Sequence, residues 1–162
     1  MPKKQITRCA WPADDELMIE YHDQEWGVPV HNDRKHFEYL TLDAFQAGLS
    51  WKTILHKREN FKKAFDNFDA KKIAKYNKIK KASLMQDAGI IRNRLKIESA
   101  VDNAKGFLEI QKEFGSFDKY IWQFVGGPAR NASRSDAGGP LLKTLEFMPS
   151  FRVSPSKEIQ AM

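Results

Sequence analysis

Apolar side chains recur at helical spacing over residues 92–114, and this long stretch constrains the fold more than any other feature of the sequence. A repeat of about 3.6 residues is typical of a helix that buries one face, and Gly115 is suited to end it. The predicted buried face comprises Ile97, Ala100, Val101, Ala104, Phe107 and Leu108.

Helical patterns also fill much of the preceding chain, whereas the alternating patterns of strands are scarce. Serine or aspartate, which cap helix N-termini well, stands directly before several of these patterns. The sequence therefore predicts further helices over residues 34–48, from 51 to about 65 behind Ser50, over 70–76 behind Asp69, over 78–87, and over 117–125 behind Ser116.

The texture of the sequence changes after Val125, where Gly-Gly-Pro occurs twice in a segment rich in Ser, Arg and Pro. A chain of 162 residues is long enough for one domain and short for two. We therefore expect one helical domain over residues 1–126, and a divergent tail over residues 127–162 for which the sequence predicts no defined order.

Several classes of protein are excluded by what the sequence lacks. No apolar run approaches the ~20 residues that span a bilayer, and the basic N-terminus has no apolar stretch behind it to form a secretory signal. Cys9 is the only cysteine, which excludes an internal disulfide and suits a reducing compartment. We therefore expect a cytoplasmic protein that does not engage a membrane.

The formal net charge of +6 is distributed unevenly along the chain. Residues 52–105 hold fifteen Lys or Arg against six Asp or Glu, a net +9, whereas residues 14–43 lean acidic. A basic half beside an acidic, aromatic-rich half indicates a polyanion-binding surface next to a chemically distinct pocket. A solvated lysine-rich surface explains the charge equally well.

A short helix, the tight turn 88–91 and the long helix behind it form a helix–hairpin–helix pattern near residues 78–114. Gly89 lets the backbone approach a phosphate, and free N–H groups at the start of the second helix favour an anion. The predicted DNA-binding residues are Gly89, Ile90, Arg92, Arg94 and Lys96. An ordinary helical hairpin inside a bundle is the alternative interpretation.

Aromatic residues gather in the first third of the chain. Enzymes that act on a base hold it outside the duplex between flat side chains, and ring faces attract a positively charged, alkylated purine. The candidate base-binding residues are Trp11, Tyr21, Trp26 and Trp51. The alternative is that these aromatics only fill the core of a small domain.

Three polar residues among these aromatics have chemistry of their own. Asp43 lies in an apolar helical run and is either half exposed beside Tyr39 and Gln46 or held in a cleft. In a cleft it can accept a hydrogen bond from a purine and stabilise positive charge on the sugar. Cys9 and His22 are competent zinc ligands, but a structural site needs four.

Five ordered blocks of the sequence resemble the DNA-3-methyladenine glycosylase I family. They run from about Arg8 to Val125 and are Arg8-Cys9-Ala10-Trp11, Tyr21-His22-Asp23-Gln24-Glu25-Trp26-Gly27-Val28-Pro29, Gln46-Ala47-Gly48-Leu49-Ser50-Trp51, Lys57-Arg58-Glu59-Asn60 and Gln86-Asp87-Ala88-Gly89-Ile90-Ile91-Arg92-Asn93-Arg94. The resemblance implies an all-α helix–hairpin–helix glycosylase fold that binds alkylated double-stranded DNA, as a monomer of the bacterial cytosol. It implies a monofunctional enzyme of base excision repair that hydrolyses the N-glycosidic bond of 3-methyladenine without an organic cofactor.

The resemblance also assigns roles to individual residues. By position, Tyr21 and Trp51 match the pair that sandwiches the methylated base, Trp11 and Trp26 match further aromatics of that pocket, and Asp43 matches its catalytic and base-recognising carboxylate. Cys9 and His22 match the first two of four ligands to a structural zinc ion.

Two departures separate this chain from the family's pattern. The family usually carries glutamate at the position of Asp43, which is one methylene shorter. The family also ends with a His and a Cys, and residues 126–162 contain neither, so we expect a truncated or altered C-terminal part and at most half a zinc site. The alternatives to an active glycosylase are a catalytically impaired DNA-binding protein of the same fold and a small zinc-binding or protein-interaction domain.

Overall fold

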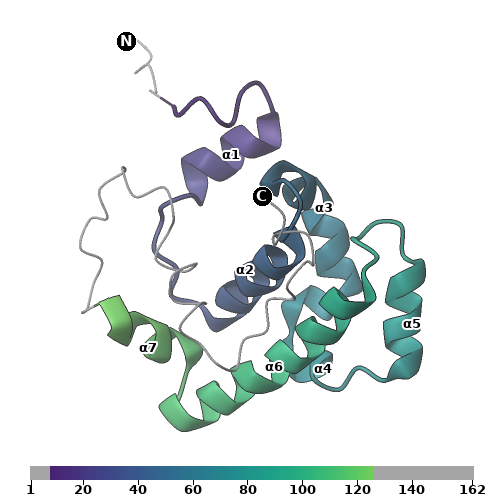
Figure 1. Ribbon diagram of the computed structural model, residues 1–162. Helices are drawn as coiled ribbons and strands as arrows, with labels where there is room; N and C mark the ends of the chain where they lie inside the picture. Colours follow the sequence, from purple (N-terminus) through teal and green to yellow (C-terminus); the bar gives the residue numbers. More distant parts are fainter. Residues whose placement is uncertain (1–7, 126–162) are drawn as a thin grey trace, which may run out of the picture.

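The computed structural model describes residues 8–125, and these residues form helices without a strand (Figure 1). The all-α class expected from the sequence is confirmed. The tail predicted over residues 127–162 lies outside the described residues. In chain order the elements are α1 (Glu16–Gln24), α2 (Asp33–Gln46), α3 (Trp51–Ala64), η1 (Asp66–Phe68), α4 (Ala70–Ile73), α5 (Lys78–Gln86), α6 (Arg94–Phe114), α7 (Phe117–Trp122) and η2 (Gln123–Val125).

A side chain caps the start of each of the helices α1 to α7. The capping oxygen accepts a hydrogen bond from a backbone N–H of the first turn, which would otherwise lack a partner. The sequence correctly predicted Ser50, Asp69 and Ser116 in this role. The full set of caps is Asp15, Asn32, Ser50, Asp69, Asn77, Asn93 and Ser116.

Several elements differ from the prediction. Helix α6 begins at Arg94 rather than at residue 92, because Asn93 is its cap. The helix predicted over residues 70–76 ends at Ile73, and the one predicted over 117–125 divides into α7 and the 3-10 turn η2. Helix α1 was not predicted, and only Met18 and His22 of its nine residues are buried.

Helices α2, α3, α4 and α7 pack against one another or against α6, which crosses the molecule as its longest helix (Figure 1). Of the six residues predicted for the buried face of α6, all except the half-buried Leu108 are fully buried. Each buried phenylalanine contributes roughly 2–3 kcal/mol relative to exposure. The fully buried phenylalanines are Phe37, Phe45, Phe61, Phe65, Phe68, Phe107 and Phe117.

Candidate functional site

The four aromatic residues singled out in the sequence lie together in the structure. The ring centroids of Tyr21, on α1, and Trp51, the first residue of α3, are 5.3 Å apart at an angle of 52°. Trp11 lies 6.3 Å from Tyr21 and 5.6 Å from Trp26. The aromatics therefore form one cluster at the end of the molecule where α1 meets α3, rather than separate pieces of the core.

Tyr21 and Trp51 touch each other directly. A base held between two parallel rings needs a ring separation of about 7 Å, twice the contact distance of carbon atoms. The 5.3 Å between these centroids is therefore too short for a sandwich unless the rings move apart. The indole N–H of Trp51 is buried and has no hydrogen-bond partner among the described residues, so a polar donor remains available in the cluster.

Asp43 lies on α2, close enough to Tyr21 for its charge to act on the phenol. Burial raises the pKa of Tyr21 to about 12, and the charges of Asp43 and Glu25 act in the same direction. Burial alone raises the pKa of Asp43 to about 6. The carboxyl group is only partly exposed, and none of the described residues donates a hydrogen bond to it. At neutral pH it is therefore an ionised acceptor to which no residue between 8 and 125 donates.

A partly buried ion network fixes the end of α1 beside α2 and α3. Arg58 of α3 donates to both carboxylate oxygens of Glu25, at 2.7 and 2.8 Å, and to Glu38 of α2 at 2.6 Å. Lys35 approaches both acids at 3.1 and 3.2 Å, and the hydroxyl of Tyr39 donates to Glu25. Arg58 is the main cause that holds the pKa of Glu25 at about 2.

Two residues of this network, Glu25 and Arg58, belong to the five ordered sequence blocks, and the sequence alone indicated no role for either. Glu25 caps the C-terminal end of α1, four residues after Tyr21. Arg58 lies two helical turns after Trp51 on α3. The network therefore fixes the two helices that carry the touching rings. Sequence separations of 33 residues for Arg58 and Glu25 and 20 for Arg58 and Glu38 left no local signal for it.

Helices α5 and α6 form the predicted hairpin, and its turn packs against α3. The ammonium of Lys57 donates to the carbonyl oxygens of Ala88 and Gly89 at 3.2 and 3.4 Å. A Cβ at Gly89 would meet Cβ and Cγ of Asn60 at 3.1 Å and Oδ1 of Asp87 at 3.0 Å. The missing side chain of Gly89 therefore allows the turn to approach α3, a contact that the sequence did not suggest.

The five residues predicted to bind DNA divide into two groups. Arg92 and Arg94 are exposed beside the turn, as a phosphate contact requires. Ile90 is buried as a whole residue, whereas Gly89 beside it is partly exposed. Lys96 differs most from the expectation, because its side chain is 8% exposed and its ammonium donates to the carbonyl oxygens of Phe45 and Ala47. That ammonium faces the protein, not solvent.

Cys9 and His22 are neighbours, but they do not make a metal centre. The backbone N–H of Cys9 donates to Nε2 of His22 at 3.4 Å, and Nδ1 of the same ring lies 3.0 Å from Asp23. Residues 8–125 contain no group of three or more His, Cys, Asp or Glu that could hold a metal ion. A structural zinc ion needs four ligands, so the described residues do not fit one, and zinc has no part in the chemistry below.

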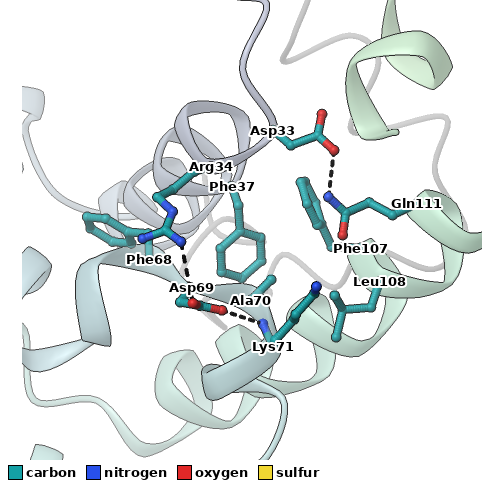
Figure 2. Close-up of a pocket in the computed structure, with 10 residues that line it drawn as sticks. All are labelled: Asp33, Arg34, Phe37, Phe68, Asp69, Ala70, Lys71, Phe107, Leu108 and Gln111. Carbon is teal, nitrogen blue, oxygen red and sulfur yellow. Dashed lines mark hydrogen bonds and ion pairs between the residues drawn. The ribbon is translucent and has the colours of Figure 1, made fainter. Parts of the chain in front are cut away.

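A hollow of about 270 Å³ opens on another part of the surface, between α2, α4 and α6 (Figure 2). Its acidic groups are already engaged, since Arg34 pairs with Asp69 and Gln111 donates to Asp33. None of the residues predicted for the site lines it. The lining residues are Asp33, Arg34, Phe37, Phe68, Asp69, Ala70, Lys71, Phe107, Leu108 and Gln111.

Two curated relatives are similar to this chain in sequence, and both are named as DNA-3-methyladenine glycosylases. DNA-3-methyladenine glycosylase of Haemophilus influenzae is 46% identical over 119 residues. DNA-3-methyladenine glycosylase 1 of Escherichia coli is 45% identical over 120 residues. Each alignment covers 74% of this chain and 64% of the relative. The chain thus matches less than two thirds of the length of either relative.

Among residues 8–125, none of the helices has the length and the hydropathy of a membrane-spanning segment.

Solved structures agree with the sequence comparison. A crystal structure of 3-methyladenine DNA glycosylase I superposes with a TM-score of 0.78 at 39% identity, over 91% of this chain and 85% of that one. The enzyme of Staphylococcus aureus, described for its recognition of 3-methyladenine, gives a TM-score of 0.72 at 37% identity, over 75% of this chain and 64% of that one.

The family model described as methyladenine glycosylase matches residues 11–144. The match takes in the aromatic cluster, Asp43 and the α5–α6 hairpin. It also continues beyond Val125, where the sequence blocks alone gave no alignment. Since it spans well over half of the 162 residues, this chain belongs to the methyladenine glycosylase family.

Proposed function

We propose that this chain hydrolyses the N-glycosidic bond of 3-methyladenine in alkylated double-stranded DNA and leaves an abasic site. The observation that carries the proposal is the carboxylate of Asp43. Burial raises its pKa to about 6, no described residue donates a hydrogen bond to it, and its charge acts on a tyrosine that touches Trp51. A partly buried acceptor that lacks a donor within the described part of the chain, beside flat rings, is suited to a base that presents an N–H and carries positive charge.

Methylation at N3 supplies the chemistry that such a site needs. The methylated adenine carries a positive charge, so the ring faces of Tyr21 and Trp51 attract it more strongly than they attract an undamaged base. The same charge makes the base a good leaving group without further protonation. Asp43 accepts a hydrogen bond from the base and stabilises the positive charge that develops on the sugar as the bond breaks. Water then attacks the sugar, and no lysine nucleophile is required.

The α5–α6 hairpin acts in this proposal as the helix–hairpin–helix grip on the DNA backbone. Its supports are the exposed Arg92 and Arg94 and the partly exposed backbone of Gly89 ahead of the start of α6. Contacts of this kind bind phosphates without reading sequence. One chain contributes every group named, so a monomer suffices. Lys96 is left out of the grip because its ammonium is buried.

Release of free base from methylated DNA tests the proposal directly. Purified protein is incubated with DNA that contains radiolabelled 3-methyladenine, and the released base is separated and counted under single-turnover conditions. Trp51→Ala should lose at least tenfold of the release rate, whereas Trp51→Phe, which keeps a ring face, should lose less. Absence of release by the unchanged chain, with the protein shown to be folded, would refute the activity.

The second candidate is a catalytically impaired DNA-binding protein of the same fold. It is favoured by the short Asp43 side chain, which reaches ~1 Å less than the glutamate that the family usually carries, and a displacement of that size can cost ~100-fold in rate. Under this alternative the chain binds abasic or alkylated duplex, with an affinity that falls steeply with salt, and releases no base. Asp43→Glu should then create base release where the unchanged chain has none.

A further inference from the structure

Lys96 is a charged residue in an unusual position. Lysine side chains are rarely buried without a partner acid, yet that of Lys96 is 8% exposed, and no carboxylate of the described residues lies within ion-pair distance. Its ammonium donates instead to the carbonyl oxygens of Phe45 at 2.8 Å and Ala47 at 2.5 Å. Burial lowers the pKa of the group.

The two acceptors belong to the end of α2. The last carbonyl groups of a helix lack partners within the helix and carry the negative end of its dipole, so a cation stabilises them. Ala47 is the residue that follows α2, and its backbone is no longer helical. Lys96 reaches this point from the first turn of α6, 49 residues further along the chain.

The end of α2 also lies between the two proposed base contacts, Asp43 and Trp51, in the sequence. Asp43 lies one helical turn before Ala47, and the turn 47–50 leads directly into Trp51. Within this turn Gly48 has a φ of +78°, and the N–H of Leu49 donates to the carbonyl oxygen of Gln46 at 2.6 Å. Lys96 therefore fixes, from α6, the short segment that separates Asp43 from Trp51.

A second lysine makes the same kind of contact in the opposite direction. Lys57 extends from α3 to the carbonyl oxygens of Ala88 and Gly89, in the turn between α5 and α6. The helix that begins with Trp51 therefore holds the hairpin turn, while the hairpin's second helix holds the turn before Trp51. These two lysine–carbonyl contacts join the hairpin and the aromatic cluster into one body.

We propose that Lys96 is a positioning residue for base excision: its ammonium holds the turn 47–50 on α6 and thereby sets Trp51 and Asp43 relative to the α5–α6 hairpin. The catalytic part of this inference rests on the proposed function, whereas its structural part, the contact of Lys96 with the turn 47–50, is independent of that function. Lys96 contributes no phosphate contact, which separates its role from that of Arg92 and Arg94.

Lys96→Met tests the inference, because it keeps the length of the side chain and removes the donor. We expect the single-turnover rate of base release to fall 10- to 100-fold, as misplacement by about 1 Å does elsewhere. The slope of DNA affinity against salt should stay that of the unchanged chain, whereas loss of one phosphate contact lowers it by about 0.9. Lys105→Met is the matched control, since this exposed lysine of α6 contacts only Asp102, at 3.0 Å.

Amide hydrogen exchange measures, without any substrate, how strongly Lys96 stabilises the turn 47–50. The N–H of Leu49 should exchange at least tenfold faster in Lys96→Met than in the unchanged chain, and the indole N–H of Trp51 should shift in an ¹⁵N spectrum. Lys96→Arg, which can still donate to both carbonyls, should restore most of the protection and most of the release. If Lys96→Met does not fold, Lys96→Gln takes its place, because its shorter, uncharged side chain cannot reach both carbonyl oxygens.

Three results would overturn the inference. In the first, Lys96→Met, or Lys96→Gln in its place, shows release within twofold of the unchanged chain together with unchanged Leu49 exchange. In the second, the salt slope falls by about one at an unchanged release rate, which would make Lys96 a phosphate contact after all. In the third, Lys105→Met has the same effects as Lys96→Met. If the unchanged chain releases no base, the proposed function fails, and the exchange of Leu49 still decides whether Lys96 holds the turn.

Discussion

Replacement of Asp43 by asparagine should stabilise the protein while it removes the carboxylate proposed for catalysis. Burial raises the pKa of Asp43 from 3.8 to about 6. Below pH 3.8 the group is neutral in both the folded and the unfolded chain, and it has no effect on stability. Between pH 3.8 and 6 the unfolded chain loses the proton while the folded chain keeps it, so the stability of the fold falls as the pH rises.

The size of the effect follows from the pKa difference. At 1.36 kcal/mol per pKa unit, the ionised carboxylate costs the fold at most about 3 kcal/mol once the pH is well above 6. Asparagine has the same shape and cannot ionise. Its advantage over aspartate should therefore grow from about 1 kcal/mol at pH 4.5 to about 3 kcal/mol at pH 7.5.

Urea unfolding at several pH values measures this difference, since the free energy of unfolding extrapolates linearly from the denaturant series. Asp102→Asn is the control, because Asp102 is exposed on α6, and its substitution should show no comparable growth with pH. The reasoning is refuted if Asp43→Asn is less stable than the unchanged chain at pH 7.5. It is equally refuted if the difference between the two proteins does not increase from pH 4.5 to pH 7.5.

Three further predictions concern the site and its supports. The kcat/KM of base release should rise with pH through a midpoint near 6 as Asp43 ionises, and a flat profile from pH 5 to 7.5 would contradict its role. Arg58→Met should destabilise the fold by ~3 kcal/mol in urea, because it leaves Glu25 and Glu38 partly buried without their guanidinium; a loss below ~1 kcal/mol would mean that Lys35 suffices. Gly89→Ala should cost ~1–3 kcal/mol, because its Cβ would lie 3.1 Å from Asn60, and unchanged stability would show that α3 yields freely.

Helix starts were the most predictable part of this fold because their signals are local. Ser50, Asp69 and Ser116 each cap a backbone N–H within three residues, so a short window of sequence contains the whole interaction. Asn93 carries the same local signal, whereas the apolar periodicity alone placed the start of α6 two residues early. Helix α1 is short, and only two of its nine residues are buried, so its pattern was a weaker guide.

The candidate site could be predicted only through the five ordered sequence blocks that resemble the family. Spacing alone did not distinguish core tryptophans from a base-binding cluster. It also left Asp43 either half exposed or held in a cleft, because its burial depends on elements distant in the chain. Lys96 shows the limit most clearly. Its neighbours in sequence are Arg92 and Arg94, which suggest a phosphate contact, but its acceptors lie 51 and 49 residues away. No local pattern encodes such a contact.

Under the proposed function, the direct contact of Tyr21 with Trp51 has a consequence for the search of DNA. A base that entered between the rings would first have to separate them, and this opening cost would lower the apparent affinity for every base by the same factor. The ratio of affinities for damaged and undamaged bases is therefore unchanged, since it depends on the positive charge of the methylated base. Occupancy by undamaged adenine does change, and undamaged adenines vastly outnumber lesions. In the proposed site, the contact between Tyr21 and Trp51 thus keeps the space between the rings free of undamaged bases.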